Sequence, residues 1–279
     1  MTFPDDNIVA TTQLSYQKYR LNDWQSGLFT TDDGEVITEG VYNNLSIAQT
    51  FARSTLNHPI FPTNGSKVSL SLQLTAPYSL FNKKDYTSID ASERYEWLEY
   101  HKWRFNAEWY MPITEKLILK TSAKLGFVGG YNAQIGISPF ERFQLGGDGL
   151  SNVQGGFTGT DIIALRGYEI SDLENNVVNG TTVATPIFNK FTMELRYPFS
   201  TNPNATIYGL AFLEAGNSYQ SFRDYNPLDV KRSAGIGIRA HLPMFGTLGF
   251  DYGLGFDKAG AKTWQNLSKI SVILGFDPE

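Results

Sequence analysis

Stretches of about ten residues in which apolar and polar side chains alternate recur along the whole chain. Residues 116–127 are the clearest example, because Leu117, Leu119, Leu125 and Phe127 share one face. A period of two places alternate side chains on opposite faces of an extended strand. The pattern recurs near residues 9–19, 44–53, 67–74, 102–109, 190–197, 207–216, 233–240, 248–255 and 269–276. The sequence therefore predicts an all-β fold with about ten antiparallel strands.

The length of these strands distinguishes two ways of burying one apolar sheet face. Strands of a soluble sandwich usually run about five or six residues, whereas a tilted strand needs about 9 to 11 residues to cross a bilayer. Short connections alternate with long ones, as in outer-membrane barrels. Aromatic residues near the strand ends fit interfacial girdles: Trp97, Tyr100, Trp109, Tyr110, Tyr197, Phe199, Phe245 and Phe256. We predict an antiparallel transmembrane β-barrel rather than a sandwich.

Composition excludes several classes of function. The net charge of -5 gives no electrostatic basis for binding nucleic acid. The chain has no cysteine, and His58, His101 and His241 lack the spacing of a metal site. No serine lies in a nucleophile elbow, and no apolar run is long enough for a transmembrane helix. We expect no cofactor, no metal and no enzymatic activity.

The longest connection, about residues 131–189, is too long for a simple turn. Its stretch 143–168, FQLGGDGLSNVQGGFTGTDIIALRGY, has enough apolar residues to require burial and many glycines, Gly146, Gly147, Gly149, Gly155, Gly156 and Gly159 among them, that allow close packing. Arg166 is the only cation in that stretch, and a buried guanidinium needs acceptors for its donors. We expect this loop to fold inward and Arg166 to bind carboxylates there.

Two strands after the loop offer those carboxylates. Alternation directs Thr192, Glu194 and Arg196 toward the lumen, and the next strand is expected to direct Tyr208, Leu210, Phe212, Glu214 and Gly216 the same way. Glu194 and Glu214 would then present acids from adjacent strands, with Phe212 as a face for the guanidinium. The sequence predicts that these residues receive Arg166.

These motifs resemble those of BamA-type outer-membrane assembly factors. The resemblance rests on FQLGGDGL and ALRGYE in the loop, on MELRYPF after it, and on the Phe-x-Glu-x-Gly of residues 212–216. It implies that Arg166, Gly167 and Tyr168 form the lid-loop motif, that Glu194 is its acid, and that Phe212, Glu214 and Gly216 form the wall motif. Family members usually have Asp where this chain has Glu214, which keeps the charge.

The resemblance also implies a position within a larger barrel. The family barrel has about sixteen strands, with the lid loop after the eleventh, whereas here the loop follows the fifth predicted strand. Residues 1–279 are thus expected to be the C-terminal part of the barrel domain, without periplasmic domains, which also explains the lack of a signal peptide. The open edges would require another chain, closure as a smaller barrel, or the remainder of a longer protein.

The function implied is folding and insertion of β-barrel proteins through a lateral seam in the bacterial outer membrane. The seam strand is expected to contain Ile270, Val272, Leu274, Gly275 and Phe276. Implied partners are the outer-membrane lipid bilayer, nascent outer-membrane β-barrel proteins and accessory lipoproteins. A two-partner secretion transporter or another channel of the same superfamily is the alternative.

Overall fold

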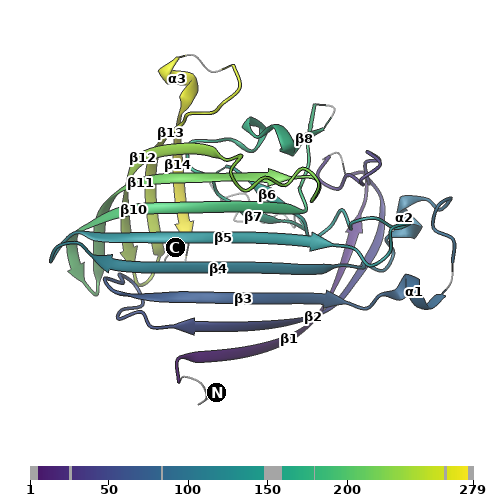
Figure 1. Ribbon diagram of the computed structural model, residues 1–279, viewed down its shortest axis with the longest axis horizontal. Coiled ribbons are helices and arrows are strands. Elements are labelled where there is room, and N and C mark those ends of the chain that lie inside the picture. The colour runs from purple at the N-terminus through teal and green to yellow at the C-terminus, as the bar shows by residue number, and fades with distance from the viewer. Residues whose placement is uncertain are drawn as a thin grey trace.

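Ten strands form one antiparallel sheet in the computed structural model, which describes residues 6–24, 27–82, 84–147, 159–178, 180–260 and 263–275. Along the sheet these are β1 (Ile8–Leu21), β2 (Gly40–Ser54), β3 (Gly65–Thr75), β4 (His101–Pro112), β5 (Ile118–Gly129), β10 (Ile187–Asn202), β11 (Ala205–Tyr219), β12 (Lys231–Leu242), β13 (Gly246–Gly255) and β14 (Ser268–Gly275) (Figure 1). The predicted all-β fold and number of strands are confirmed. The long loop follows β5, as expected.

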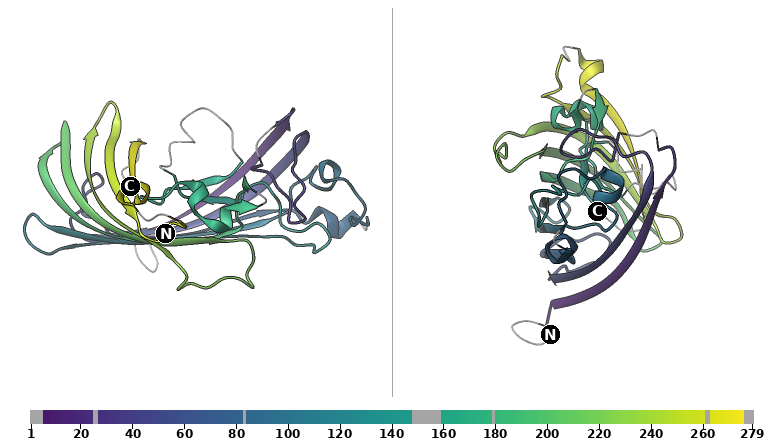
Figure 2. Two further views of the ribbon diagram at one scale, coloured as in Figure 1. Left: turned by 90° about the horizontal axis from the view of Figure 1, so that it is seen from above. Right: turned by 90° about the vertical axis from the view of Figure 1, so that its right-hand side faces the viewer.

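The sheet curves around a concave face but does not close. Its two edges are β1 and β14, which form no ladder with each other within the described ranges (Figure 2). Closure as a smaller ten-stranded barrel, one of the expected alternatives, is therefore wrong for this sheet. The long loop packs buried side chains against the concave face of this open sheet.

The two faces of the sheet differ in polarity as the alternation predicts. On β10, the side chains of Thr192, Glu194 and Arg196 are buried on the concave face, while Met193 and Leu195 are exposed on the convex face. Apolar residues on the outside and polar residues on the inside are typical of membrane-spanning barrels. Among the described residues, no helix is both long and apolar enough to cross a membrane.

The predicted aromatic girdle is only partly correct. Trp97, Trp109, Tyr197, Phe199, Phe245 and Phe256 are exposed, but Tyr100 and Tyr110 are buried. Tyr110 follows the outward Trp109 along β4, so the alternation itself turns it inward, where it packs near Arg196. Tyr100 donates a hydrogen bond to Asn44 from the interior. These two tyrosines belong to the interior.

Connections alternate between the two rims of the sheet. Short turns join β2 to β3, β4 to β5, β10 to β11 and β12 to β13, while longer segments occupy the other rim. The described parts of these longer segments include the short α-helices α1 (Tyr78–Asn82), α2 (Ala91–Arg94) and α3 (Trp264–Leu267) (Figure 1). The predicted alternation of short and long connections is confirmed.

Candidate functional site

The loop between β5 and β10 lies against the concave face of the sheet (Figure 2). Its described segments are β6 (Phe143–Leu145), β7 (Asp161–Ile163), the 3-10 helices η2 (Ile170–Asp172) and η3 (Glu174–Asn176), β8 (Val177–Val178) and β9 (Thr181–Thr182). Phe140, Phe143 and Leu165 of the loop are completely buried in one cluster with residues such as Tyr42 on β2 and Tyr100 just before β4. The run FQLGGDGL is described only as far as Gly147, and residues 148–158 lie outside the described ranges.

Arg166 follows β7 and binds acids on two neighbouring strands. Its Nη2 donates to Glu194 Oε1 on β10 at 2.7 Å and to Glu214 Oε1 on β11 at 2.7 Å. Nε and the backbone N–H also donate to the Glu214 carboxylate, each at 2.9 Å. The guanidinium carbon lies 3.8 Å from the Phe212 ring centroid, and Nη1 lies 3.7 Å from Asp251 Oδ2. Charge-assisted bonds of this kind are among the strongest in proteins.

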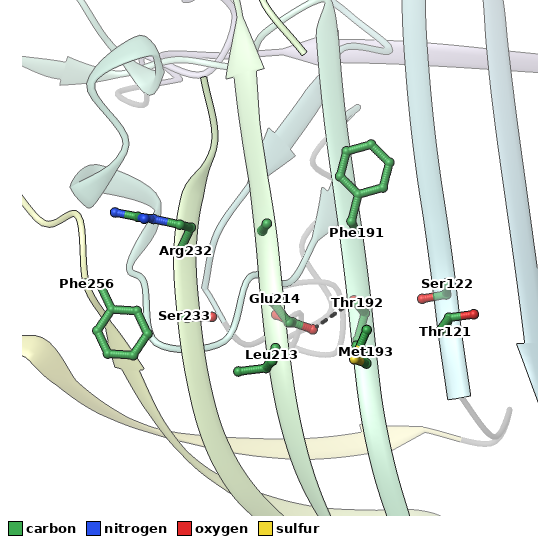
Figure 3. A pocket seen from close by; sticks show the side chains of 11 residues that line it. Thr121, Ser122, Phe191, Thr192, Met193, Leu213, Glu214, Arg232, Ser233 and Phe256 are labelled. Carbon is green, nitrogen blue, oxygen red and sulfur yellow. Dashed lines mark hydrogen bonds between the residues drawn. The ribbon is translucent and has the colours of Figure 1, made fainter. Parts of the chain in front are cut away.

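Further cations surround the two glutamates. Lys190 Nζ lies 2.9 Å from Glu214 Oε1, and the Thr192 hydroxyl donates to the same oxygen at 3.2 Å (Figure 3). Arg196 Nε donates to Glu194 Oε2 at 2.8 Å. Each carboxylate is thus shared between Arg166 and a cation of β10. Buried acids need such partners, because an unpaired buried charge is strongly unfavourable.

Asp251 on β13 joins this network and was not singled out from the sequence. It accepts a paired interaction from Arg239 on β12, at 2.7 Å from Nη1 and 2.8 Å from Nη2. Glycines on β12 provide the space: a Cβ at Gly237 would lie 1.8 Å from Asp251 Oδ1, and one at Gly235 would lie 2.5 Å from the Phe212 ring. The sequence did contain a signal for this pair: the alternation in residues 233–239 and 249–255 places Arg239 and Asp251 on the polar faces of their strands.

Gly167 and Tyr168 lie against β13 on the concave face. Gly167 has φ +90, and a Cβ there would lie 3.0 Å from the backbone of Gly255, so glycine permits this close approach. Gly253 faces Gly167 equally closely. The Tyr168 hydroxyl donates to the backbone carbonyl of Arg232 at 2.7 Å. The loop backbone is therefore packed directly on the wall beside the Arg166 site.

The structure brings most of the predicted site residues together. Arg166, Glu194, Phe212 and Glu214 are in mutual contact, and Gly167 and Tyr168 extend that contact to β13. Gly216 instead lies opposite Lys190 in the β10–β11 ladder, where a Cβ would lie 2.7 Å from the carbonyl oxygen of Asn189.

The predicted seam residues lie mostly on β14, at one edge of the sheet. Ile270 and Leu274 are exposed on the convex face, Val272 shares their face, and Gly275 ends the strand. Phe276 lies outside the described residues. β14 pairs with β13 over residues 268–275. β12 and β13 lie between β11, which carries Glu214, and this edge, and Asp251 of β13 is itself part of the Arg166 network.

Electrostatics keep Arg166 charged. Burial lowers its pKa, but the charges of Glu214 and Glu194 outweigh this effect and raise the pKa above its ordinary value. Burial also raises the pKa of Tyr168 to about 12. In the described part of the chain, no group of three or more His, Cys, Asp or Glu residues is arranged to hold a metal ion. The arrangement is suited to holding the loop in place.

The outer side of the same wall carries an apolar groove of about 680 Å³. Phe191, Met193, Leu213 and Phe256 line it on the convex face, on β10, β11 and the segment after β13 (Figure 3). Glu214 and Thr192 stand beside these residues but form the hydrogen bond of the interior network. One pair of strands thus carries an ionic inner face and an apolar outer face.

Comparisons with known proteins agree with this architecture. The model of the Omp85 superfamily domain matches residues 2–269. BamA from Haemophilus ducreyi lacking POTRA domains 1-3 is similar in structure, with a TM-score of 0.60 and 16% identity over 97% of this chain and 52% of that chain. CdiB from Escherichia coli is also similar, with a TM-score of 0.54 and 13% identity over 96% of this chain and 42% of that chain. The chain thus spans about half or less of each. No curated protein matches it.

Proposed function

The chain belongs to the Omp85 superfamily, and from this premise we propose that it helps to fold and insert β-barrel proteins into the outer membrane. It is a β-sheet protein of the bacterial outer membrane, with an apolar convex face for lipid. Its proposed clients are nascent outer-membrane β-barrel proteins, and its proposed partner subunits are accessory lipoproteins. The proposed activity is mechanical and involves no bond-making chemistry.

The observation that supports this proposal most is the binding of Arg166 to Glu194 and Glu214. The three side chains are almost fully buried, so their interaction is screened little by water. Removing one partner of a buried ion pair typically costs about 3–5 kcal/mol, because the other charge remains buried. We propose that this lid-loop lock braces the wall while the seam strand opens, and that Gly167 and Tyr168 hold the braced loop against β13.

The open edges provide the surface on which clients would act. A free strand edge presents unpaired N–H and C=O groups that pair readily with an extended segment. β14, with Ile270, Val272 and Leu274 on its lipid-facing side, is the proposed seam strand. An incoming strand would add to this edge by backbone hydrogen bonds, and its side chains would alternate between lipid and interior.

The decisive experiment compares Arg166→Ala with the wild-type protein in lipid vesicles. The substrate is a urea-denatured small outer-membrane barrel, whose folding is followed by its resistance to unfolding in detergent at room temperature. Arg166→Ala should slow client folding and lower the stability of the protein while its strands still form. Arg223→Ala is the matched control, because Arg223 is an exposed arginine of another loop. Equal client folding by Arg166→Ala and wild type would refute the proposed lock.

A transporter of the two-partner type would behave differently in the same vesicles. It would secrete a dedicated partner and conduct ions through a pore, without accelerating the folding of unrelated barrels. Conductance across a planar bilayer, measured beside the folding assay, separates these outcomes. Conductance with no acceleration of client folding would replace the assembly function with a transport function.

A further inference from the structure

A second ionic cluster binds the loop to the other half of the sheet. Lys102 on β4 is fully buried, and its Nζ lies 3.1 Å from Glu141 Oε2 and 3.0 Å from Asp161 Oδ2. The Tyr19 hydroxyl on β1 donates to Glu141 Oε1 at 2.8 Å, and Asn44 Nδ2 on β2 donates to the same oxygen at 2.9 Å. Glu141 thus contacts three different strands of this half.

The backbone of Glu141 is itself unusual. Its φ is +65, in the left-handed region that residues with a side chain rarely adopt. Such conformations persist only where surrounding contacts determine them. The contacts here are the bonds to Lys102, Tyr19 and Asn44, together with a backbone hydrogen bond from Glu141 N–H to the Gly159 carbonyl.

The short strands β6 and β7 connect this cluster to Arg166. They pair in parallel, with Phe143 opposite Asp161, so their starting ends lie together. Glu141 lies two residues before the first residue of β6 and Asp161 begins β7, which places both acids at one end. Arg166 follows the other end of β7. The pair therefore has an acidic end bound to β4 and a cationic end bound to β10 and β11.

The loop also reaches the opposite edge of the sheet. Beyond Arg166, Glu169 Oε2 lies 2.9 Å from Lys269 Nζ on β14, and Lys269 also donates to the Tyr168 carbonyl at 3.2 Å. Through Tyr19 the same loop contacts β1. One loop therefore binds both edge strands, β1 and β14, from the concave side.

We infer that Glu141 is a second positioning residue, which with Arg166 makes the β6–β7 pair a strut that fixes the separation of the two sheet edges. This inference relies on the proposed function only in treating the edges as working surfaces. Without the Glu141 end, the loop would keep its contacts at Arg166 and its apolar packing on Tyr42, but its hydrogen bonds and ion pair to β1, β2 and β4 would be lost, so this half of the sheet would be held less tightly. The separation of the edges would then vary.

The edge separation can be measured directly, because the chain has no native cysteine. Leu14 on β1 and Ile270 on β14 are 75% and 70% exposed, so spin labels at Leu14→Cys and Ile270→Cys disturb little. Pulsed electron paramagnetic resonance of the full chain in lipid vesicles, without client, gives the distribution of distances between them. We expect a single narrow distribution of distances between the labels in the otherwise wild-type protein. In the Glu141→Gln variant we expect this distribution to broaden.

Matched variants separate positioning from a general loss of structure. Glu141→Asp keeps the charge and should retain the narrow distribution. Glu93→Gln removes an exposed ion pair with Lys84 in another loop and should change nothing. Folded Glu141→Gln protein with an unchanged distribution would overturn the inference. Because no client is present, that result would leave the client-folding test of Arg166 unaffected.

Two further measurements apply if Glu141→Gln does not fold. Asp161→Asn alters the same cluster at a side chain that is 34% exposed, and its folded protein should also lose the narrow distribution. In the wild-type protein, the backbone amides of Phe143 and Asp161 should exchange hydrogen as slowly as those of β10. An unchanged distribution in Asp161→Asn, or rapid exchange at these amides, would overturn the inference.

Discussion

The contacts of Arg166 match the planar geometry of a guanidinium. Its planar donors reach two carboxylates while its face rests on Phe212. The acids are in turn shared with Lys190 and Arg196, so a change at one position affects the whole network. At the residue scale, the site is therefore a set of coupled charges.

Arg166→Lys tests the importance of this shape. Lysine keeps the positive charge but loses the planar fork and the broad stacking face, so the free energy of unfolding should fall by about 2 kcal/mol. The measurement is urea unfolding in lipid vesicles, with Arg223→Lys as the control at an exposed position. Equal stability of Arg166→Lys and wild type would mean that charge alone holds the loop.

Gly237→Ala tests the space reserved for Asp251. The added methyl group would overlap the Asp251 carboxylate and disturb its pairing with Arg239, at a cost of about 1–3 kcal/mol in unfolding free energy. In an Asp251→Ala background the same substitution should cost clearly less, because the overlapping group is gone. Additive effects of the two substitutions would contradict this role of Gly237.

Residue-level prediction from the sequence succeeded where the strand period was strong. Alternation on β10 and β11 directed Glu194, Phe212 and Glu214 inward, as observed. Asp251 was missed because its strand is rich in glycine, and nothing local indicates that a distant loop fills that space. The ion pair between Glu141 and Lys102 was likewise not predictable, because the length of the loop between β5 and β10 does not indicate which strand each of its residues contacts.

At the scale of elements, β10 combines two environments in one strand. Leu195 on its convex face is paired with Leu119 on β5 and Ala211 on β11, near the middle of the strand. Leu195→Lys should therefore lower the unfolding free energy in bilayers by about 2–4 kcal/mol. Thr201→Lys, near the turn, should cost about 0–1 kcal/mol, since it lies near the interface. Equal costs at both positions would contradict the assignment of the lipid face.

The edge strand β14 should open more readily than the interior strands. It has eight residues and, within the described residues, pairs with β13 alone, whereas β10 has 16 residues and pairs with both β5 and β11. Amide hydrogen exchange in vesicles should therefore be faster in β14 than in β10. Equal protection of the two strands would argue against a weak seam at β14.

Strand positions were predictable from the sequence because a single period defined them, but strand ends were not. β10 and β11 extend to 16 and 15 residues, beyond the alternating segments. Their extensions follow from pairing with each other across a short turn at residues 203–204 rather than from local pattern. Tyr110 points inward because it alternates with the outward Trp109 on β4, and Tyr100, just before β4, donates its hydroxyl to Asn44 in the interior.

On the scale of the whole molecule, the sheet and the loop form one unit. The sheet order is linear, so no ladder links β1 to β14 in the described part of the chain. The loop contacts both of these strands from the concave side. Superfamily membership was predictable from loop and wall motifs, and the family match confirms it. The sequence alone left unresolved whether the partial barrel is completed by another chain, by closure as a smaller barrel or by the rest of a longer protein.

The coupling free energy between Arg166 and Glu214 tests the central claim most directly. A double-mutant cycle with Arg166→Met and Glu214→Gln, measured by urea unfolding of the protein in lipid vesicles, isolates this energy. If the loop is locked on the wall, the two substitutions should be strongly non-additive, with a coupling of about 2–3 kcal/mol. A coupling near zero would mean that the guanidinium and the carboxylate do not hold each other, and that the loop is not locked.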